Sequence, residues 1–501
     1  MRRISGHLPI AKAALLTASL FALAACAVGP DFEKPAPPAV TGYTPQPLTA
    51  TGSAPAPGGD AQHFDMSKDI SADWWTVFHS QPLNALVDEA LKNNSDLKAA
   101  QAALKSSREA VLAQRGAFFP SIAAGFSATR EQDPPGALAP VPSDNAFLYN
   151  LYTPELSLSY SPDVWGLNRR TVESATAQEK AVRFQLFAAY VTLTSNVVVT
   201  AIQIASIDDQ IAATRELVQA DQKVLDIFQE QLKKGYASGV DLATQQSALA
   251  SAQTALPPLL KQSAQLHDLM ATLTGHFPSE GPQAEFTFAS LTLPTDLPLS
   301  VPSTLVEQRP DIRQAEENLH SASAQIGVAV ANRLPNITIT AAAGSEALNL
   351  GQLFEPGTGF WNIGASLAAP IFQGGQLLHQ EREARANYEQ AAAQYKSTVL
   401  SAFQNVADTL AALEQDAAAL KAAAAADAAA KHALDLTERQ VHDGYSSGVD
   451  LFTAQQTYQT AHIGLVQAQA DRYADTAALF QALGGGWWHR TDIAARNDNE
   501  N

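Results

Sequence analysis

The sequence Gly-Tyr-Ala-Ser-Gly-Val-Asp-Leu at residues 235–242 returns as Gly-Tyr-Ser-Ser-Gly-Val-Asp-Leu at residues 444–451. Seven of the eight letters agree, and the second copy lies 209 positions after the first. A long helical pattern leads into each copy, and a second helical pattern leaves it. Because a glycine after a helix commonly takes the positive φ that closes a C-cap, Gly235 and Gly444 predict two tight helix-turn-helix tips.

An apolar ladder with a seven-residue spacing leads into each tip. Such a spacing, kept over six or more heptads, is typical of a coiled coil, since a lone straight helix drifts out of that register. The predicted helices cover residues 171–234 and 377–442 and would span ~96 and ~99 Å at 1.5 Å per residue. Because a compact domain is not that wide, we favour extended coiled coils over amphipathic helices of a compact domain. The rungs are Tyr190, Val197, Ile204, Ile211, Val218, Leu225 and Leu232 in the first ladder, and Val399, Val406, Leu413, Leu420, Asp427, Leu434 and Val441 in the second.

Two predicted β-hairpins, 120–161 and 335–370, carry four strands in which apolar residues alternate with small or polar ones. Membrane strands with one lipid face and one lumen face have this pattern, but so does a half-buried sheet in a soluble protein. Four strands cannot close a barrel, and a membrane tolerates no open sheet edge, so several chains must pool their strands. Two chains would give eight strands and a filled interior; three would give twelve strands and an open lumen. The apolar sets are Ile122, Ala124, Phe126 and Ala128; Leu156, Leu158 and Tyr160; Ile337, Ile339, Ala341 and Ala343; and Trp361, Ile363, Ala365 and Leu367.

The two halves of the chain match as a tandem duplication with small insertions. Pro120 corresponds to Pro335 at an offset of 215, and Pro162 to Pro370 at 208. In each half a short helix leads into the strands, the long helix leaves them, and a second short helix returns from the tip, so that the two short helices stack end to end beside the long one. The predicted fold is mainly α with a small membrane β-barrel part. The predicted repeats are 83–275 and 303–486; the short helices are 95–116, 310–332, 241–274 and 450–483, and the coiled-coil hairpins are 171–274 and 377–483.

The segments outside the repeats are assigned from composition. Residues 276–302, with five prolines, form a structural linker between the halves. Residues 26–82 form an extended leader, poorly packed over 27–70, and 487–501 form a polar tail, which we expect to be disordered after Trp488.

The N-terminus resembles a bacterial secretory signal, residues 1–25, that ends in a lipobox. Arg2, Arg3 and Lys12 precede an apolar run, and small residues precede Cys26, the only cysteine of the chain. We therefore expect Cys26 to become the lipidated first residue, against the alternative of a buried free cysteine, with Ala27 after it directing the protein to the outer membrane. No other cofactor and no metal site are expected, since one cysteine excludes a disulfide scaffold and a multi-cysteine metal site.

Charge argues against nucleic acid as a partner. The full chain has a net charge of -18, and removal of three basic residues with the signal leaves 29 positive against 50 negative side chains, about -21. We find no run of about 20 apolar residues after Cys26, which predicts that any membrane crossing is made by strands.

The motifs taken together resemble the TolC-like outer-membrane factors, in particular the lipoprotein (NodT-type) branch that serves RND-type efflux pumps. This resemblance implies a homotrimer with a 12-stranded outer-membrane barrel and a 12-helix periplasmic tunnel. It also implies that an inner-membrane pump and a periplasmic adaptor pass drugs, toxic compounds or metal ions to the tunnel at its tips; a type I protein secretion conduit has the same fold and is the alternative. The resemblance rests on Cys26 with Val28-Gly29-Pro30-Asp31 and Pro35, Trp74-Trp75-x-x-Phe78 with Pro82 and Leu83, Arg309-Pro310-Asp311-Ile312-Arg313, Ala482-Leu483-Gly484-Gly485-Gly486-Trp487, and the paired tips.

The same resemblance makes the tips the candidate adaptor contact. Asp241 is expected to act mainly as a helix N-cap, whereas Asp450 is equally consistent with a cap and with a gate at the closed end of the tunnel, where three copies would form an acidic ring. His432, His442 and His462 near the second tip are expected to be solvated, because no two are one helical turn apart. The contact candidates are Gly235, Ser238, Gly239, Val240, Asp241, Gly444, Ser447, Gly448, Val449 and Asp450.

One motif suggests an enzyme. Residues 444–448 fit G-x-S-x-G, the nucleophile-elbow pattern, but an elbow follows a strand and a helix is predicted here, while the first copy has Ala237 at the nucleophile position. We therefore do not expect catalysis.

Overall fold

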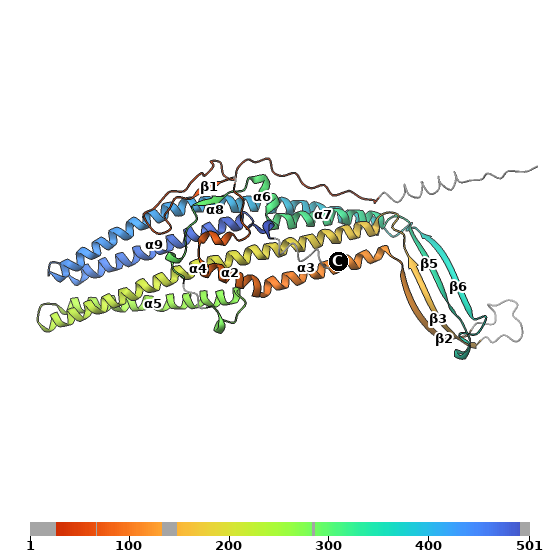
Figure 1. Cartoon of the computed structure of the whole chain (residues 1–501), viewed down its shortest axis with the longest axis horizontal. Helices are drawn as coiled ribbons and strands as arrows, with labels where there is room; N and C mark the ends of the chain where they lie inside the picture. Colours follow the sequence, from red (N-terminus) through yellow and green to blue (C-terminus); the bar gives the residue numbers. More distant parts are fainter. Residues whose placement is uncertain (1–26, 67, 133–147, 283–285, 491–501) are drawn as a thin grey trace, which may run out of the picture. The chain divides into compact units, whose positions relative to one another are not determined.

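The computed structural model of the chain describes residues 27–66, 68–132, 148–282 and 286–490. Several parts lie outside the described residues, among them Cys26, the connection between the strands of the first predicted hairpin (residues 133–147), and the tail beyond Arg490. Figure 1 shows the elements in chain order: β3 and β6 lead into the two long helices, and each long helix ends in a helical tip.

The long helices are α4, Leu167–Lys233, and α8, Gln376–His442, each of 67 residues. Both predicted helices are confirmed, with starts and ends within four residues of the expected ones. The ladder residues are buried from Tyr190 to Ile211 and from Val399 to Leu420, and become more exposed toward the tips. The other helices are α2 (Gln81–Asn93), α3 (Ser95–Arg115), α5 (Gly239–Leu273), α6 (Pro302–Gln308), α7 (Pro310–Ala331) and α9 (Gly448–Ala482), of which α2 and α6 were not assigned bounds from the sequence.

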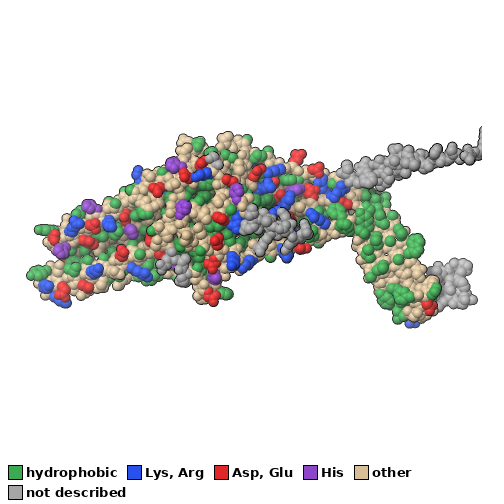
Figure 2. Space-filling view, viewed as in Figure 1, with side chains coloured by type: hydrophobic (Ala, Val, Ile, Leu, Met, Phe, Trp, Pro, Cys, Tyr) green, Lys and Arg blue, Asp and Glu red, His purple; other side chains and the backbone are tan. Residues whose placement is uncertain are grey.

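The four predicted strands are present and form one antiparallel sheet in the order β2-β3-β5-β6. The register places the four predicted apolar sets on one face: Ile122 pairs with Leu158, Leu158 with Ala341, and Ala341 with Ile363. Figure 2 shows apolar side chains gathered over these strands. Ile122, Phe126, Trp361 and Ile363 are all more than half exposed, so the described residues leave this face uncovered. The strands are β2 (Ser121–Gln132), β3 (Leu148–Tyr160), β5 (Asn336–Ser345) and β6 (Gly359–Ala368).

The chain divides into two compact units, and each takes segments from both predicted repeats. Unit 1 contains the residues up to Lys34, Lys105–Ala181 and Glu316–Gln394, and so holds the sheet and the helix ends next to it. Unit 2 contains Pro35–Leu104, Val182–Ala315 and Tyr395–Asn501, and so holds both tips and the main core.

The prediction that residues 27–70 pack poorly is wrong at Thr51, Gln62 and Ile70, which are buried. The last part of the leader, predicted to be extended, forms a short 3-10 helix in which Trp74, Trp75 and Phe78 are almost fully buried, and Trp74 stacks on Phe480 with 5.1 Å between ring centroids. Strand β1 (His63–Asp65) pairs in parallel with β4 (Asp296–Pro298) of the linker, which is the structural role expected for the linker.

Polar contacts hold the leader where its composition suggests a loose chain. The buried Arg472 guanidinium donates hydrogen bonds to Thr51 Oγ1 (3.2 Å) and to the carbonyl oxygen of Asp60 (2.5 Å). Gln62, also buried, donates to Thr476 Oγ1 at 3.0 Å. Buried donors and acceptors need partners, and each residue type here is common in loops, so composition alone did not reveal the packing.

The C-terminal prediction also needs correction at its first residues. The indole nitrogen of Trp487 donates to the Gln308 carbonyl oxygen at 2.6 Å, and Trp487 stacks on Phe187. His489 is hydrogen-bonded to Asp69, and Arg490 forms an ion pair with Asp73 at 3.1 Å. Residues 487–490 are therefore packed against other segments of unit 2.

The short helices meet end to end, as predicted. Asn94 caps α3 by accepting from the Leu97 amide, and its side-chain amide donates to the Leu273 carbonyl oxygen at the end of α5 (3.1 Å). In the second half, Arg309 just before α7 donates to the Ala482 carbonyl oxygen at the end of α9 (2.8 Å). Each junction thus uses a side chain to satisfy carbonyl groups left free at a helix end.

The prediction that no apolar window follows Cys26 is wrong by a hydropathy test. Helix α4 contains an 18-residue window with a mean hydropathy of 1.5, long and apolar enough to cross a membrane by length and composition. However, 67% of this window is buried inside the structure, and a core helix meets the same test.

Candidate functional site: the two helical tips

Both tips close with the same hydrogen bonds. At the first tip the Tyr236 amide donates to the Gln231 carbonyl oxygen (2.8 Å) and the Gly235 amide to that of Leu232 (2.9 Å). At the second tip the Tyr445 amide donates to the Gln440 carbonyl oxygen at 2.7 Å. This pattern is the Schellman motif, which requires a left-handed residue after the helix. Gly235 and Gly444 have φ of 81° and 78°, so the predicted C-caps are confirmed.

Both returning helices begin with a capping box. The hydroxyl oxygen of Ser238 accepts from the Asp241 amide, and the Asp241 carboxylate accepts from the Ser238 amide at 3.0 Å. Ser447 and Asp450 form the same box at the start of α9, again with 3.0 Å between the Ser447 amide nitrogen and the Asp450 carboxylate. Ser238 and Ser447 are therefore the N-caps, and Asp241, expected to be an N-cap, contributes to the cap from the third helical position, as Asp450 does.

Asp450 makes one hydrogen bond that Asp241 lacks among the bonds of the described residues. The hydroxyl of Ser446 donates to Asp450 Oδ2 at 2.9 Å, while the first copy has Ala237 at that position. The backbone amide of Ser447, then the hydroxyls of Ser447 and Ser446, hold the pKa of Asp450 below its ordinary value. Its carboxylate is fully exposed and ionised at neutral pH, as an acidic ring would require.

Two tyrosines at the tips were missed by the sequence reasoning. Tyr236 is 82% exposed and Tyr445 is 85% exposed, and neither ring is needed to close its turn. Val240 and Val449 next to them are also exposed. A signal was available, since both tyrosines belong to the letters that the two copies share. The tips therefore present rigid turns with apolar side chains toward solvent.

The tips differ in how they pack. A Cβ added to Gly448 would lie 3.0 Å from the ring of the buried Phe228 at the end of α4, whereas a Cβ added to Gly239 would meet nothing within 4 Å. The start of α9 thus packs directly on α4, while the start of α5 stands free. Of the candidates, Gly448 is buried, and Gly235, Ser238, Gly239, Val240, Asp241, Gly444, Ser447, Val449 and Asp450 are exposed or half-buried.

A polar layer lies behind the tips. Asp221 of α4 is buried, and the Gln245 side-chain amide donates to its backbone carbonyl (3.1 Å) and its carboxylate (3.3 Å). Burial raises the pKa of Asp221, and the hydrogen bond from Gln245 opposes that rise. These contacts join α4 to α5.

One histidine is not solvated as predicted. His462 of α9 is half-buried, and its Nδ1 lies 2.9 Å from Asp427 Oδ1 of α8. Asp427 is the polar rung that interrupts the second ladder, so the pair explains the interruption. His432 and His442 are exposed as expected. Within the described ranges no group of three or more His, Cys, Asp or Glu residues is arranged to hold a metal ion.

The serine motif follows a helix. Ser446, at the nucleophile position of G-x-S-x-G, comes directly after α8 and donates its hydroxyl hydrogen to Asp450. A nucleophile elbow follows a strand and exposes the serine to a base, and neither condition holds here.

Comparisons with known proteins agree with this geometry. The family model "Outer membrane efflux protein" matches residues 86–276 and 301–485. The pyoverdine export outer membrane protein OpmQ of Pseudomonas aeruginosa is 28% identical over 463 residues, which are 91% of this chain and 96% of that relative. The toluene efflux pump outer membrane protein TtgC of Pseudomonas putida is 27% identical over 491 residues, 96% of each chain.

Solved structures share the fold. The outer-membrane channel OprN superposes with a TM-score of 0.81 at 24% identity, covering 92% of this chain and 100% of that one. The outer membrane protein VceC of Vibrio cholerae gives a TM-score of 0.77 at 25% identity, covering 84% of this chain and 100% of that one.

Proposed function

Since this chain belongs to the outer membrane efflux protein family, we propose that three copies of it build one conduit and that its helical tips receive a periplasmic adaptor. As a family member, the protein is the outer-membrane channel component of an efflux pump. The number of copies, the surface that binds the adaptor and the class of solute are proposals.

The sheet supports an assembly of several copies. In the described sheet β2 and β6 are the outer strands, and each pairs with one neighbour. Backbone groups of an unpaired edge are strongly unfavourable in a bilayer, so these edges need β6 and β2 of neighbouring copies. Three copies give twelve strands and an open lumen, whereas two give eight strands and a filled interior.

The tips support docking. The single observation that carries this proposal is the exposure of Tyr236 and Tyr445 on two turns that their own hydrogen bonds make rigid. An exposed aromatic side chain on a pre-organised turn loses little conformational entropy on binding, and aromatic residues are enriched in protein interfaces. A periplasmic adaptor, working with an inner-membrane pump of the RND type, is the proposed partner.

The solutes are proposed to be small organic molecules. The relatives above are named for export of pyoverdine and for efflux of toluene, and this chain covers almost their whole length. Choice of solute is left to the pump, so a conduit of the same build serves different solutes.

Lipidation of Cys26 and a gate at Asp450 complete the proposal. The lipid adds a second attachment to the outer membrane beside the strands. At the gate, three exposed carboxylates in a narrow opening would attract cations and resist further closure. The capping box does not compete with this role, because the hydrogen bonds from Ser446 and Ser447 all go to one carboxylate oxygen of Asp450, Oδ2.

Photo-crosslinking in cells tests the docking. An aromatic photo-crosslinker replaces Tyr236 or Tyr445, where it keeps the size of the ring and leaves the serine caps intact. Phe277, 76% exposed in the linker, is the matched control. We expect both tip variants to capture the periplasmic adaptor and the Phe277 variant to capture none. Recovery of no adaptor from either tip would refute the docking surface.

A further inference from the structure

The first described residues of the chain, 27–34, lie along α4 and α7 in unit 1, and we call them the strap. The Val28 amide donates to the Trp165 carbonyl oxygen at 3.0 Å. Gly29 has φ of 93°, and a Cβ there would lie 2.4 Å from Gly327 Cα. The Phe32 ring stacks on His320 with 4.3 Å between centroids and 12° between planes. The strap is therefore seated, although its composition resembles that of a loose linker.

Arg170 on α4 is the centre of this contact. Its side chain is only 5% exposed. Nε donates to the Val28 carbonyl oxygen (3.1 Å), and Nη2 donates to Asp31 Oδ1 (2.7 Å) and to the Gly29 carbonyl oxygen (3.4 Å). Nη1 donates to Glu173 Oε2 at 2.7 Å. A buried guanidinium is tolerated only when its hydrogens have acceptors, and the strap supplies most of them here.

The position of Arg170 is unfavourable for its own helix. It is the fourth residue of α4, close to the helix N-terminus, where the helix dipole disfavours a positive charge. Asp163 caps this helix by accepting from the amides of Asn168 and Arg169, so the cap does not need Arg170. The strap is what makes an arginine favourable here.

The duplicated half serves as an internal control. Helices α4 and α8 match at an offset of 209, so Arg170 corresponds to His379, and with Pro120 matched to Pro335, Gly327 corresponds to Leu112. His379 and Leu112 are both exposed. The arginine occurs in the first repeat and the glycine in the second, each only on the copy of its helix that contacts the strap.

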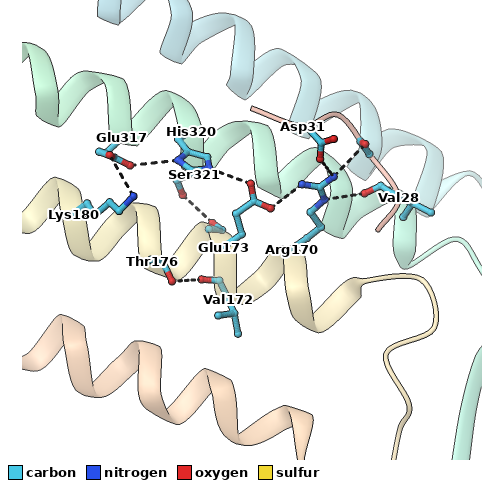
Figure 3. Close-up of polar contacts among 12 residues, drawn as sticks. Val28, Asp31, Arg170, Val172, Glu173, Thr176, Lys180, Glu317, His320 and Ser321 are labelled. Carbon is cyan, nitrogen blue, oxygen red and sulfur yellow. Dashed lines mark hydrogen bonds and ion pairs between the residues drawn. The ribbon is translucent and has the colours of Figure 1, made fainter. Parts of the chain in front are cut away.

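Further contacts support the residues that hold the strap. Glu173 lies 3.0 Å from His320 Nε2, so one carboxylate supports both Arg170 and the ring under Phe32. On its other side His320 Nδ1 faces Glu317 at 3.4 Å, and Lys180 faces Glu317 at 3.8 Å (Figure 3). These side chains run along α4 and α7 and link the two helices under the strap.

We propose that Arg170 and Gly327 are positioning residues that seat the strap, so that the membrane anchor attached at Cys26 leaves the protein where β3 joins α4. The inference deepens the proposed function and rests on its lipidation step. Ala27 reaches Gly166, because a Cβ on that glycine would lie 2.6 Å from Ala27 Cβ, and Gly166 stands between β3 and α4. Membrane strands end at this junction, so an acyl chain starting there enters the bilayer beside them.

Hydrogen exchange of the full-length protein, extracted from outer membranes in detergent, tests whether Arg170 and Gly327 hold the strap in place. Arg170→Gln removes the charge, and Gly327→Ala fills the space under Gly29 while favouring the helix that carries it. We expect amides of the strap to exchange about tenfold faster or more in both variants, as loss of charged hydrogen bonds implies. Arg333→Gln, which breaks the Arg333–Glu381 pair of the same unit without touching the strap, should exchange like the unmodified protein.

Two results would overturn the proposal. Unchanged exchange of the strap in both Arg170→Gln and Gly327→Ala would show that these residues do not seat it. The second readout is cleavage after the exposed Glu33 by a glutamate-specific protease, with mass analysis of the released N-terminal fragment. We expect faster cleavage in both variants and a fragment that carries acyl chains. A fragment without acyl chains would refute the anchor role and lipidation, while a three-copy native mass of the same sample would leave the conduit intact.

Discussion

A pair of carboxyl groups between α8 and α9 makes stability depend on pH in a direction that opposes the usual one for carboxylates. The carboxyl groups of Asp416 of α8 and Asp475 of α9 lie close enough to share one proton. Asp416 Oδ2 is buried, and no N–H or hydroxyl donor of the other described residues reaches it. Two ionised carboxylates have no hydrogen to share, so the contact is favourable only while one proton lies between them.

The physical causes of the shift are all local. Burial raises the pKa of Asp416 most, followed by the hydrogen bond and charge of Asp475 and the charge of Asp471, while Arg472 lowers it. Together they raise the pKa of Asp416 from 3.8 to about 7. The folded protein therefore holds a proton that the unfolded chain releases above about pH 4. The contribution of this pair to the free energy of unfolding falls as the pH rises from about 4 to about 7, and is level on either side.

The magnitude follows from the shift. One pKa unit corresponds to about 1.4 kcal/mol, so the full shift would give about 4 kcal/mol. Asp416 is half-buried and solvent screens part of this, so we expect about 1–2 kcal/mol for Asp416→Asn. The variant should be more stable than the unmodified protein above pH 7 and should lose the slope between pH 4 and 7.

Thermal unfolding of the detergent-extracted protein, followed by helical circular dichroism at one scan rate, measures this slope. Asp408→Asn is the matched control, since Asp408 is exposed on the same helix and accepts a hydrogen bond from Gln404. It should keep the slope of the unmodified protein. A midpoint for Asp416→Asn that is lower than that of the unmodified protein at pH 8 would refute the shared proton.

Three further predictions concern the tips and the core. Asp450→Asn, which keeps an oxygen for the cap, should raise single-channel conductance in planar bilayers and relieve block by divalent cations, whereas Asp241→Asn should do neither; equal traces for both variants would count against the gate. Gly444→Ala places a side chain at φ of 78° and should lower the free energy of unfolding by about 1–2 kcal/mol, measured by denaturant titration, with no change expected if the turn is mobile. Trp74→Ala, in the buried stack on Phe480, should lower it by about 3–5 kcal/mol, and a loss below 1 kcal/mol would contradict the packing of the leader.

Much of the fold could be predicted because it is periodic. The heptad spacing of residues such as Val197 and Leu413 located both long helices, and the alternation at Ile122 and Ile363 located the sheet and the face these residues share. Repetition added the rest: Gly235 and Gly444 fixed the turns, and the same letters fixed both capping boxes. Each of these signals is local, so a single sequence carries it.

The parts that were missed depend on contacts between distant segments. Nothing near Arg472 indicates that its guanidinium fastens the leader at Asp60, and nothing near His462 indicates its pairing with Asp427. The exposure of Tyr236 also required the structure, because its repetition in the second copy marks the position without showing that the ring faces solvent. The polar leader and the tip surface therefore required the structure.

The central claim is that one chain supplies part of a wall that several copies complete. The native mass of the complex extracted from outer membranes, measured together with its conductance in planar bilayers, tests this directly. We predict a mass of three chains and a conducting pore. A compact single chain without conductance would contradict the account.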